Sequence, residues 1–183
     1  AGRLSRRIGL LTVGAGAYLA LLPFVHPADA VGMRSPAWVP VHLLYFAALA
    51  IILLALTALL LGRMAEAGPL DLAGFFGAFL GTAMLLMEGR EHLFSPSFGQ
   101  GELPGLWELI AGALIFSVGY ILLGVAIMRA GELPRSAGLL LAIGGPIVAF
   151  SPPIGIVLVQ IIGHALFGVG LARLGYARWS EGR

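Results

Sequence analysis

Long runs of apolar residues, separated by short segments with proline, glycine or charged residues, are the dominant pattern of the chain. A helix needs about 20 mostly apolar residues to cross the hydrocarbon core of a bilayer. The pattern predicts an all-α, polytopic membrane protein: a bundle of six transmembrane helices with short loops, forming a single transmembrane domain over residues 1–183. The expected helices lie at residues 8–25, 41–61, 71–92, 106–128, 137–150 and 154–174.

The first and last apolar regions need interpretation, because neither has the flanking residues or the length of a simple transmembrane helix. Residues 8–25 lie between three arginines and the small-residue segment Ala28-Asp29-Ala30, as in a signal peptide, but we interpret them as the first spanning helix. Residues 137–174 are too long for one span. Ser151-Pro152-Pro153 interrupts them, and proline cannot continue the helical hydrogen-bond ladder. We therefore predict a short fifth helix that ends at Phe150, a tight turn and a sixth helix.

The arginines are distributed unevenly along this topology. Six spans place both termini on one side, and nine of the eleven basic residues then share that side: Arg3, Arg6, Arg7, Arg63, Arg129, Arg135, Arg173, Arg178 and Arg183. Basic residues accumulate in the cytoplasmic loops of membrane proteins. We therefore expect a multi-pass protein of the inner (plasma) membrane with both termini cytoplasmic.

Composition narrows the classes of function. The chain has no cysteine, which excludes disulfides, thiolate ligands and a cysteine nucleophile. It also has no lysine, which excludes a Schiff-base pigment. Its arginines sit at helix ends, which indicates topology rather than nucleic-acid binding. The expected partners are the lipid bilayer and either other membrane subunits or a second copy, packed through glycine faces such as Gly74, Gly77 and Gly81.

Residues 87–94, at the end of the third run, are the main anomaly of the sequence. Only 11% of the chain is charged, yet Glu88, Arg90, Glu91 and His92 fall within five positions. Glu88 and His92 are four apart and share one helical face. An ionisable group at membrane depth is costly unless it faces protein or water, and so suggests a functional site. We expect both side chains to point into the bundle, with Glu88 facing a cavity or paired with Arg34.

Other polar positions fall near the same, outer face of the predicted bundle, and together they suggest an outward-facing pocket. The expected pocket residues are His42, Tyr45, Glu88, His92, Glu108, Gln160 and His164. The first hypothesis is that His42, Glu88 and His92 bind a transition metal, or that His42, His92 and His164 hold a b-type haem. A small ligand is equally compatible with this set. In the alternative, these are interfacial histidines bonded to water or carbonyls; His26, between prolines, is expected to be solvated.

Two segments resemble an uncharacterised group of bacterial six-helix integral membrane proteins. They are residues 128–141, which begin Met128-Arg129-Ala130-Gly131, and residues 168–179, which end at Trp179. The resemblance implies a six-helix fold and no particular activity.

The chain also resembles the rhomboid intramembrane proteases. That family has six helices, with a histidine early in the second, a serine in the fourth and a histidine in the sixth, matching His42, Ser117 and His164 here. The resemblance implies a serine hydrolase in which Ser117 is the nucleophile and His164 the base. The family's Gly-X-Ser-Gly motif reads Ile-Phe-Ser-Val at residues 115–118, and its helix-two asparagine is replaced by Phe46.

The sequence thus leaves three classes of function open. The first is a membrane protein that binds a metal, haem or small ligand in the polar pocket. The second is an accessory or structural subunit of a larger membrane complex, with no chemistry of its own. The third is a rhomboid-like intramembrane hydrolase.

Overall fold

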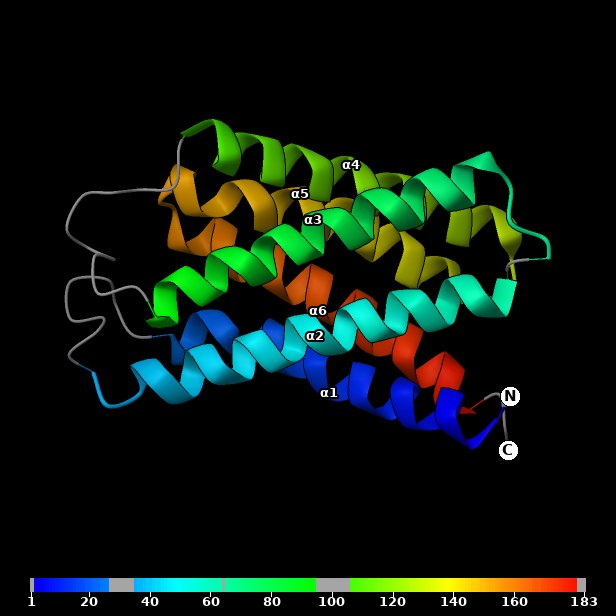
Figure 1. Cartoon of the computed structure of the whole chain (residues 1–183), viewed down its shortest axis with the longest axis horizontal. Helices are drawn as coiled ribbons and strands as arrows, with labels where there is room; N and C mark the ends of the chain where they lie inside the picture. The colour runs from blue at the N-terminus through cyan, green and yellow to red at the C-terminus, as the bar shows by residue number, and fades with distance from the viewer. Residues whose placement is uncertain (1, 27–34, 64, 95–105, 181–183) are drawn as a thin grey trace.

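The computed structural model contains six α-helices (Figure 1) and describes residues 2–26, 35–63, 65–94 and 106–180, without the side chains of residues 88–94, 106–109 and 152–154. The all-α class and the six predicted helices are confirmed. The helices are α1 (Arg3–Val25), α2 (Trp38–Arg63), α3 (Pro69–Phe94), α4 (Leu106–Ala130), α5 (Arg135–Ile154) and α6 (Val157–Ser180).

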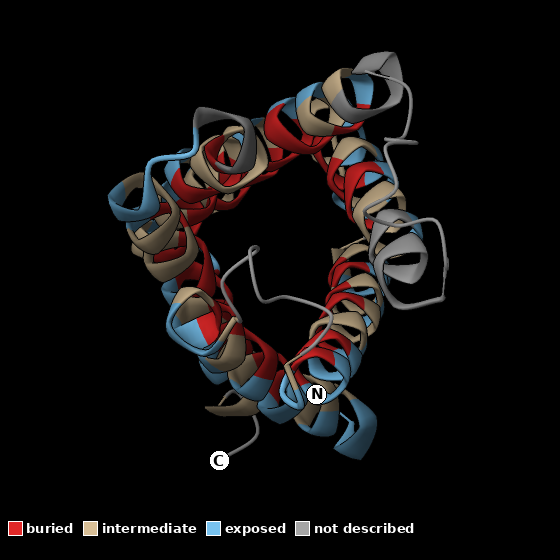
Figure 2. Cartoon of the chain, turned by 90° about the vertical axis from the view of Figure 1, so that its left-hand side faces the viewer, coloured by how far each residue is buried: buried red, intermediate tan, exposed pale blue. Residues whose placement is uncertain are grey.

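The helices form a closed ring, seen end-on in Figure 2. Each packs against its neighbour in the chain, and α6 returns to pack against α1, which is the most extensive contact. The least extensive contacts are those of α2 with α1 and α3. Exposed residues lie mainly on the outer faces of the helices, where a bilayer would surround them (Figure 2).

Five helices in the described part of the chain are long and apolar enough to cross a membrane, which indicates a multi-pass membrane protein. They comprise α1, α2, residues 69–87 of α3, residues 110–130 of α4, and α6, while α5 offers a shorter apolar stretch, Arg135–Ser151. Both chain ends lie at one end of the bundle (Figure 1). We call this the arginine end, because Arg3, Arg63 and Arg135 lie there; the opposite end, with His26 and His42, is the histidine end.

Helix α5 continues past the expected boundary at Phe150, through two prolines, to Ile154. In a regular helix the carbonyl of Val148 would accept the N–H of residue 152, which proline lacks. The Ser151 hydroxyl donates to that carbonyl instead, at 3.2 Å. The chain then turns at Gly155, whose φ of +69° favours glycine. A serine that replaces the missing donor therefore lets the helix run further than the prolines suggested.

Glycines bring several neighbouring helices together backbone to backbone. Between α1 and α6, Gly9 faces Gly175 and Gly16 faces Gly168. A Cβ added to Gly16 would lie 2.5 Å from the Gly168 carbonyl oxygen, too close for any side chain. The glycine face of α3 packs within the chain, and not against the partner subunit or second copy expected for it: a Cβ on Gly81 would meet the α4 backbone at 2.4 Å. Such close contacts favour helix association in lipid, where apolar burial alone gives little.

Aromatic side chains fill the middle of the ring. The rings of Phe116 and Tyr120 on α4 have centroids 4.5 Å apart, and they pack against Phe167 on α6 at 5.4 and 4.8 Å. Tyr120 is fully buried, and its hydroxyl lies 3.0 Å from Thr82 Oγ1 on α3. Thr82 already donates to the Ala78 carbonyl, so the tyrosine is the donor. This cluster connects α3, α4 and α6 across the centre of the bundle.

Candidate functional site

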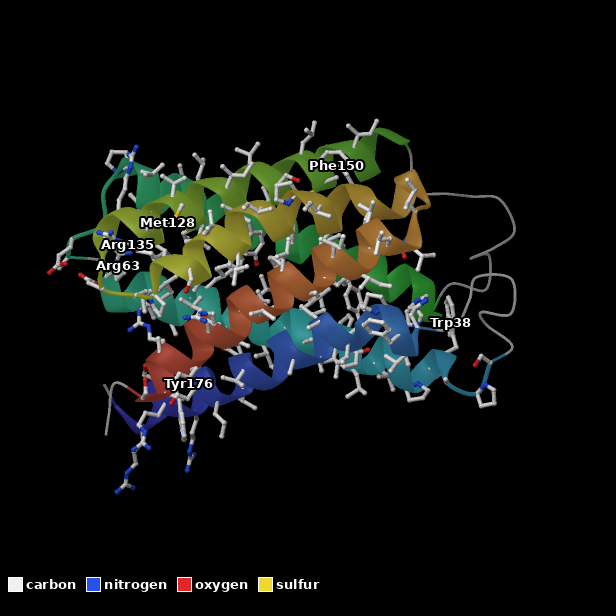
Figure 3. All side chains as sticks on the ribbon, turned by 180° about the vertical axis from the view of Figure 1, so that it is seen from behind. Trp38, Arg63, Met128, Arg135, Phe150 and Tyr176 are labelled. Atoms are coloured by element: carbon white, nitrogen blue, oxygen red, sulfur yellow. The ribbon has the colours of Figure 1, made fainter. Side chains whose placement is uncertain are left out.

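Three aromatic rings from α1 and α2 form the core of the histidine end. Ring centroids lie 4.0 Å apart for Trp38 and His42, 5.1 Å for His26 and His42, and 5.7 Å for His26 and Trp38. Trp38 and His42 are buried, whereas His26 is half-buried. His26 therefore packs against two rings, in contrast to the solvated loop position expected for it. Trp38 is labelled at this end in Figure 3.

Local backbone structure sets the positions of these rings. His26 caps α1, its N–H donating to the Leu22 carbonyl at 2.9 Å. Ser35 begins the turn into α2, because its hydroxyl and carbonyl oxygens accept the N–H groups of Ala37 and Trp38. Trp38 and His42 then lie four residues apart on one face of α2.

The imidazole of His42 is oriented by its own helix. Its Nδ1 lies 2.9 Å from the Trp38 carbonyl oxygen. A carbonyl only accepts hydrogen bonds, so Nδ1 carries the proton and Nε2 is the acceptor nitrogen of the neutral ring. Beside it, the Tyr18 hydroxyl of α1 donates to the carbonyl of Val41, which joins α1 to α2.

Helix α6 brings a third histidine to this end. The Nδ1 of His164 lies 2.9 Å from the Gln160 carbonyl oxygen, so this ring too is held with Nε2 as its acceptor. His164 is half-buried and close enough to His26 for an electrostatic interaction. His26 and His42 are thus in ring contact, and His164 of α6 lies within electrostatic range of His26.

The described residues contain part of the predicted pocket. His42, Gln160 and His164 take the positions given above, and Tyr45 is half-buried against the apolar core. The side chains of Glu88, His92 and Glu108 lie outside the described residues, although α3 ends and α4 begins at the histidine end. Their expected orientation toward the interior therefore stays a prediction.

The described side chains give a metal or haem no support. No group of three or more histidine, aspartate or glutamate side chains among them could hold a metal ion. Of the expected metal ligands, only His42 has a described side chain. For haem, His92 is likewise outside the described part, and the rings of His26, Trp38 and His42 contact one another.

Ser117 and His164, the pair suggested by the rhomboid resemblance, each bond to their own helix. The Ser117 hydroxyl donates to the Ala113 carbonyl at 2.6 Å, as buried serines in spanning helices commonly do. The His164 Nδ1 bonds the Gln160 carbonyl. Helix α5 packs against both α4 and α6, the two helices that carry these residues. In this arrangement the Ser117 hydroxyl and the His164 ring bond to backbone carbonyls of their own helices and not to each other.

The arginine end contains an ion cluster that sequence analysis treated only as a topology signal. Arg63, at the end of α2, lies 3.3 Å from Asp71 of α3 and 3.5 Å from Glu132 of the α4–α5 loop. Its side chain is only 11% exposed. A hollow of about 420 Å³ beside it is also lined by Glu66 and Arg129. The motif Arg-x-x-Glu occurs at the end of α2 as Arg63–Glu66 and at the end of α4 as Arg129–Glu132, and it was the signal that could have indicated this cluster.

Comparison with known proteins adds no information on function, so the site is interpreted from its geometry alone. The resemblances to bacterial six-helix proteins and to rhomboid proteases remain predictions. No family model, curated protein or solved structure matches this chain.

Proposed function

We propose that this multi-pass membrane protein binds a small lipid-soluble molecule at the histidine end. The observation that carries the proposal is the ring contact of His26, at the end of α1, with His42 and the buried Trp38 of α2, with His164 of α6 within electrostatic range of His26. Polar and aromatic groups gathered from different helices are typical of ligand sites in bundles. A ring of apolar helices without such a site would have little need for these side chains, since each polar group at membrane depth costs stability.

The orientation of the rings suggests the chemistry of the ligand. His164 Nε2 accepts a hydrogen bond when the ring is neutral, because Nδ1 is occupied by the Gln160 carbonyl. It therefore favours a ligand that donates, such as an aromatic alcohol or amine. Trp38 and His26 offer ring faces and edges to an aromatic ligand. The ligand would reach these rings from the bilayer, between α2 and its neighbours, which are the least extensive contacts of the ring.

The proposal includes the orientation of the protein in the membrane. The eight arginines with described side chains all lie toward the arginine end, which also holds both chain ends. This distribution supports a cytoplasmic arginine end in the inner membrane. Reporter fusions at Ser180 and at Ser35 should report opposite sides, the first cytoplasmic; fusions reporting the same side would contradict the topology.

The ligand proposal is tested on protein purified from its own membranes. Solvent extracts of the wild type should contain a small aromatic molecule in stoichiometric amount by mass spectrometry. His164→Ala and Trp38→Leu should lose it, whereas the control Thr57→Ala should keep it, because Thr57 bonds only its own helix on an exposed part of α2.

Three results would contradict this proposal. The first is an extract with phospholipid alone, which would favour an accessory subunit without chemistry. The second is a stoichiometric metal or a haem absorption band in the same sample, which would favour the metal and haem hypothesis. Labelling of Ser117 by a serine-reactive phosphonate would instead favour a hydrolase.

A further inference from the structure

The arginine end divides into two parts with different charge. The described carboxylates of this end, Glu66, Asp71 and Glu132, belong to the α2–α3 and α4–α5 connections or the first turn of α3. The start of α1 and the last turns of α6 carry only basic charges in the described residues. Within that description, neither Arg3, Arg7 nor Arg173 makes an ion pair, whereas Arg63 makes two. Among the described residues, the ion pairs of this end therefore involve Arg63 and not Arg3, Arg7 or Arg173.

Three exposed arginines, Arg3, Arg7 and Arg173, belong to two helices that are held close together. Gly9 of α1 and Gly175 of α6 meet backbone to backbone, with 2.7 Å between an added Cβ and the opposing carbonyl oxygen. Arg3 and Arg7 are exposed and lie four apart on one face of α1, while Arg173 is exposed on the neighbouring part of α6. We call Arg3, Arg7 and Arg173 the α1–α6 arginine cluster.

The faces that carry this cluster continue into the lipid-facing surface. Arg7 lies one turn before Leu11, which is 51% exposed, and Arg173 lies one turn after Val169, which is 46% exposed. The cluster therefore sits where the apolar outer surface ends. Figure 3 shows long side chains with nitrogen at their tips extending away from the bundle near Tyr176.

An aromatic pair marks the same level as a membrane interface. The rings of Tyr176 and Trp179, at the end of α6, lie with centroids 5.6 Å apart, and Tyr176 is 57% exposed. Tyrosine and tryptophan concentrate at the level of lipid headgroups, where their rings meet apolar surface and their polar atoms meet water. The arginine cluster therefore lies at the depth of phosphate groups.

We infer that the α1–α6 arginine cluster binds the headgroup phosphate of an anionic phospholipid. Guanidinium groups bind phosphate through two parallel, charge-assisted hydrogen bonds. Among the described residues, no carboxylate pairs with Arg3, Arg7 or Arg173, so their charge is available to a headgroup. An anionic headgroup is preferred over a zwitterionic one because the choline of the latter would bring a cation toward the arginines.

The test is native mass spectrometry of the whole protein released from nanodiscs of mixed phosphatidylglycerol and phosphatidylcholine. The variant Arg7→Gln/Arg173→Gln removes one arginine from each helix of the cluster. Its matched control, Arg129→Gln/Arg135→Gln, removes two exposed arginines from the same end of the bundle. Thermal melting in detergent without phosphatidylglycerol should be alike for all three proteins, since the substitutions are exposed.

We expect the wild type and the control to retain phosphatidylglycerol in preference to phosphatidylcholine, and the Arg7→Gln/Arg173→Gln variant to retain about tenfold less. Excess inorganic phosphate should not displace the lipid. The inference is overturned if the cluster variant keeps its phosphatidylglycerol, if both variants lose it equally, or if inorganic phosphate displaces it.

Discussion

Helix α2 is held in the ring differently from the other helices. The neighbouring pairs α1–α6, α3–α4, α4–α5 and α5–α6 each contain glycines whose added Cβ would strike the facing helix. The glycine of α2, Gly62, meets the guanidinium group of Arg178 instead of a backbone. Polar side chains hold α2 at its two ends: Tyr18 at the histidine end, and Arg63 at the arginine end.

Because of this difference, the contacts that contribute most to the stability of the bundle are not those that position the candidate site. Close backbone contact gives many small dispersion gains and leaves little freedom for the helices to shift. Attachment through a few side chains is weaker, and each such contact can be removed by one substitution. Because Trp38 and His42 both belong to α2, the helix that presents the candidate site is also the one held least tightly.

The largest effect should come from opening the α1–α6 contact. In Gly168→Leu, the new Cβ would lie 2.4 Å from the Gly16 carbonyl oxygen, so the two helices must separate. We expect a loss of at least about 3 kcal/mol in the free energy of unfolding. The control is Gly14→Leu on the same helix pair, where nothing lies within 4 Å of the new Cβ. Denaturant titration in detergent micelles would measure both, and equal stability of the two variants would contradict the role given to the glycines.

A smaller effect is expected at the arginine end of α2. Arg63→Gln removes both ion pairs of a mostly buried guanidinium and leaves Asp71 without its partner. Asp71 and Glu132 are partly exposed, so solvent moderates the loss to roughly 2 kcal/mol. Arg129→Gln, an exposed neighbour in the same hollow, should change stability by less than about 0.5 kcal/mol. If Arg63→Gln and Arg129→Gln are equally stable, the ion pairs of Arg63 do not hold α2 in the bundle.

The smallest effect should come from the histidine end of α2. Tyr18→Phe keeps the ring and removes the one hydrogen bond to the Val41 carbonyl, at a cost of about 1 kcal/mol. Tyr176→Phe removes an exposed hydroxyl and should be near neutral. The Tyr18 variant should also retain less ligand than the wild type, because the start of α2 carries Trp38 and His42. If the Tyr18 variant is less stable but keeps its full ligand content, the hydrogen bond between Tyr18 and Val41 stabilises the bundle without contributing to the ligand site.

Sequence reasoning recovered features that depend on one helix and missed those that depend on two. The apolar runs predicted six helices, and the spacing of Gly74, Gly77 and Gly81 predicted a glycine face on the third helix, but not that this face packs on α4 within the chain. The contact of Gly9 with Gly175 requires knowing that the first and last helices are neighbours, which no local pattern states.

The same limit applies to the polar groups. Arg63 takes its carboxylates from two different connections, so its burial was not visible in the sequence of either. His26 was expected in solvent because prolines flank it, but the turn into α2 brings Trp38 against it. In contrast, the predicted end of the fifth helix was wrong for a local reason. The Ser151 hydroxyl replaces a backbone donor that proline lacks, so α5 continues past Phe150.

The central claim, a small-molecule site at the histidine end, is tested most directly by an X-ray map of crystals grown in lipid from protein purified out of its own membranes. We predict non-protein density in contact with Trp38 and within hydrogen-bond distance of His164 Nε2, with the ring of His26 moved from its contact with His42. A map in which the rings of His26, Trp38 and His42 pack against one another, with only protein and water around His164, would contradict the account.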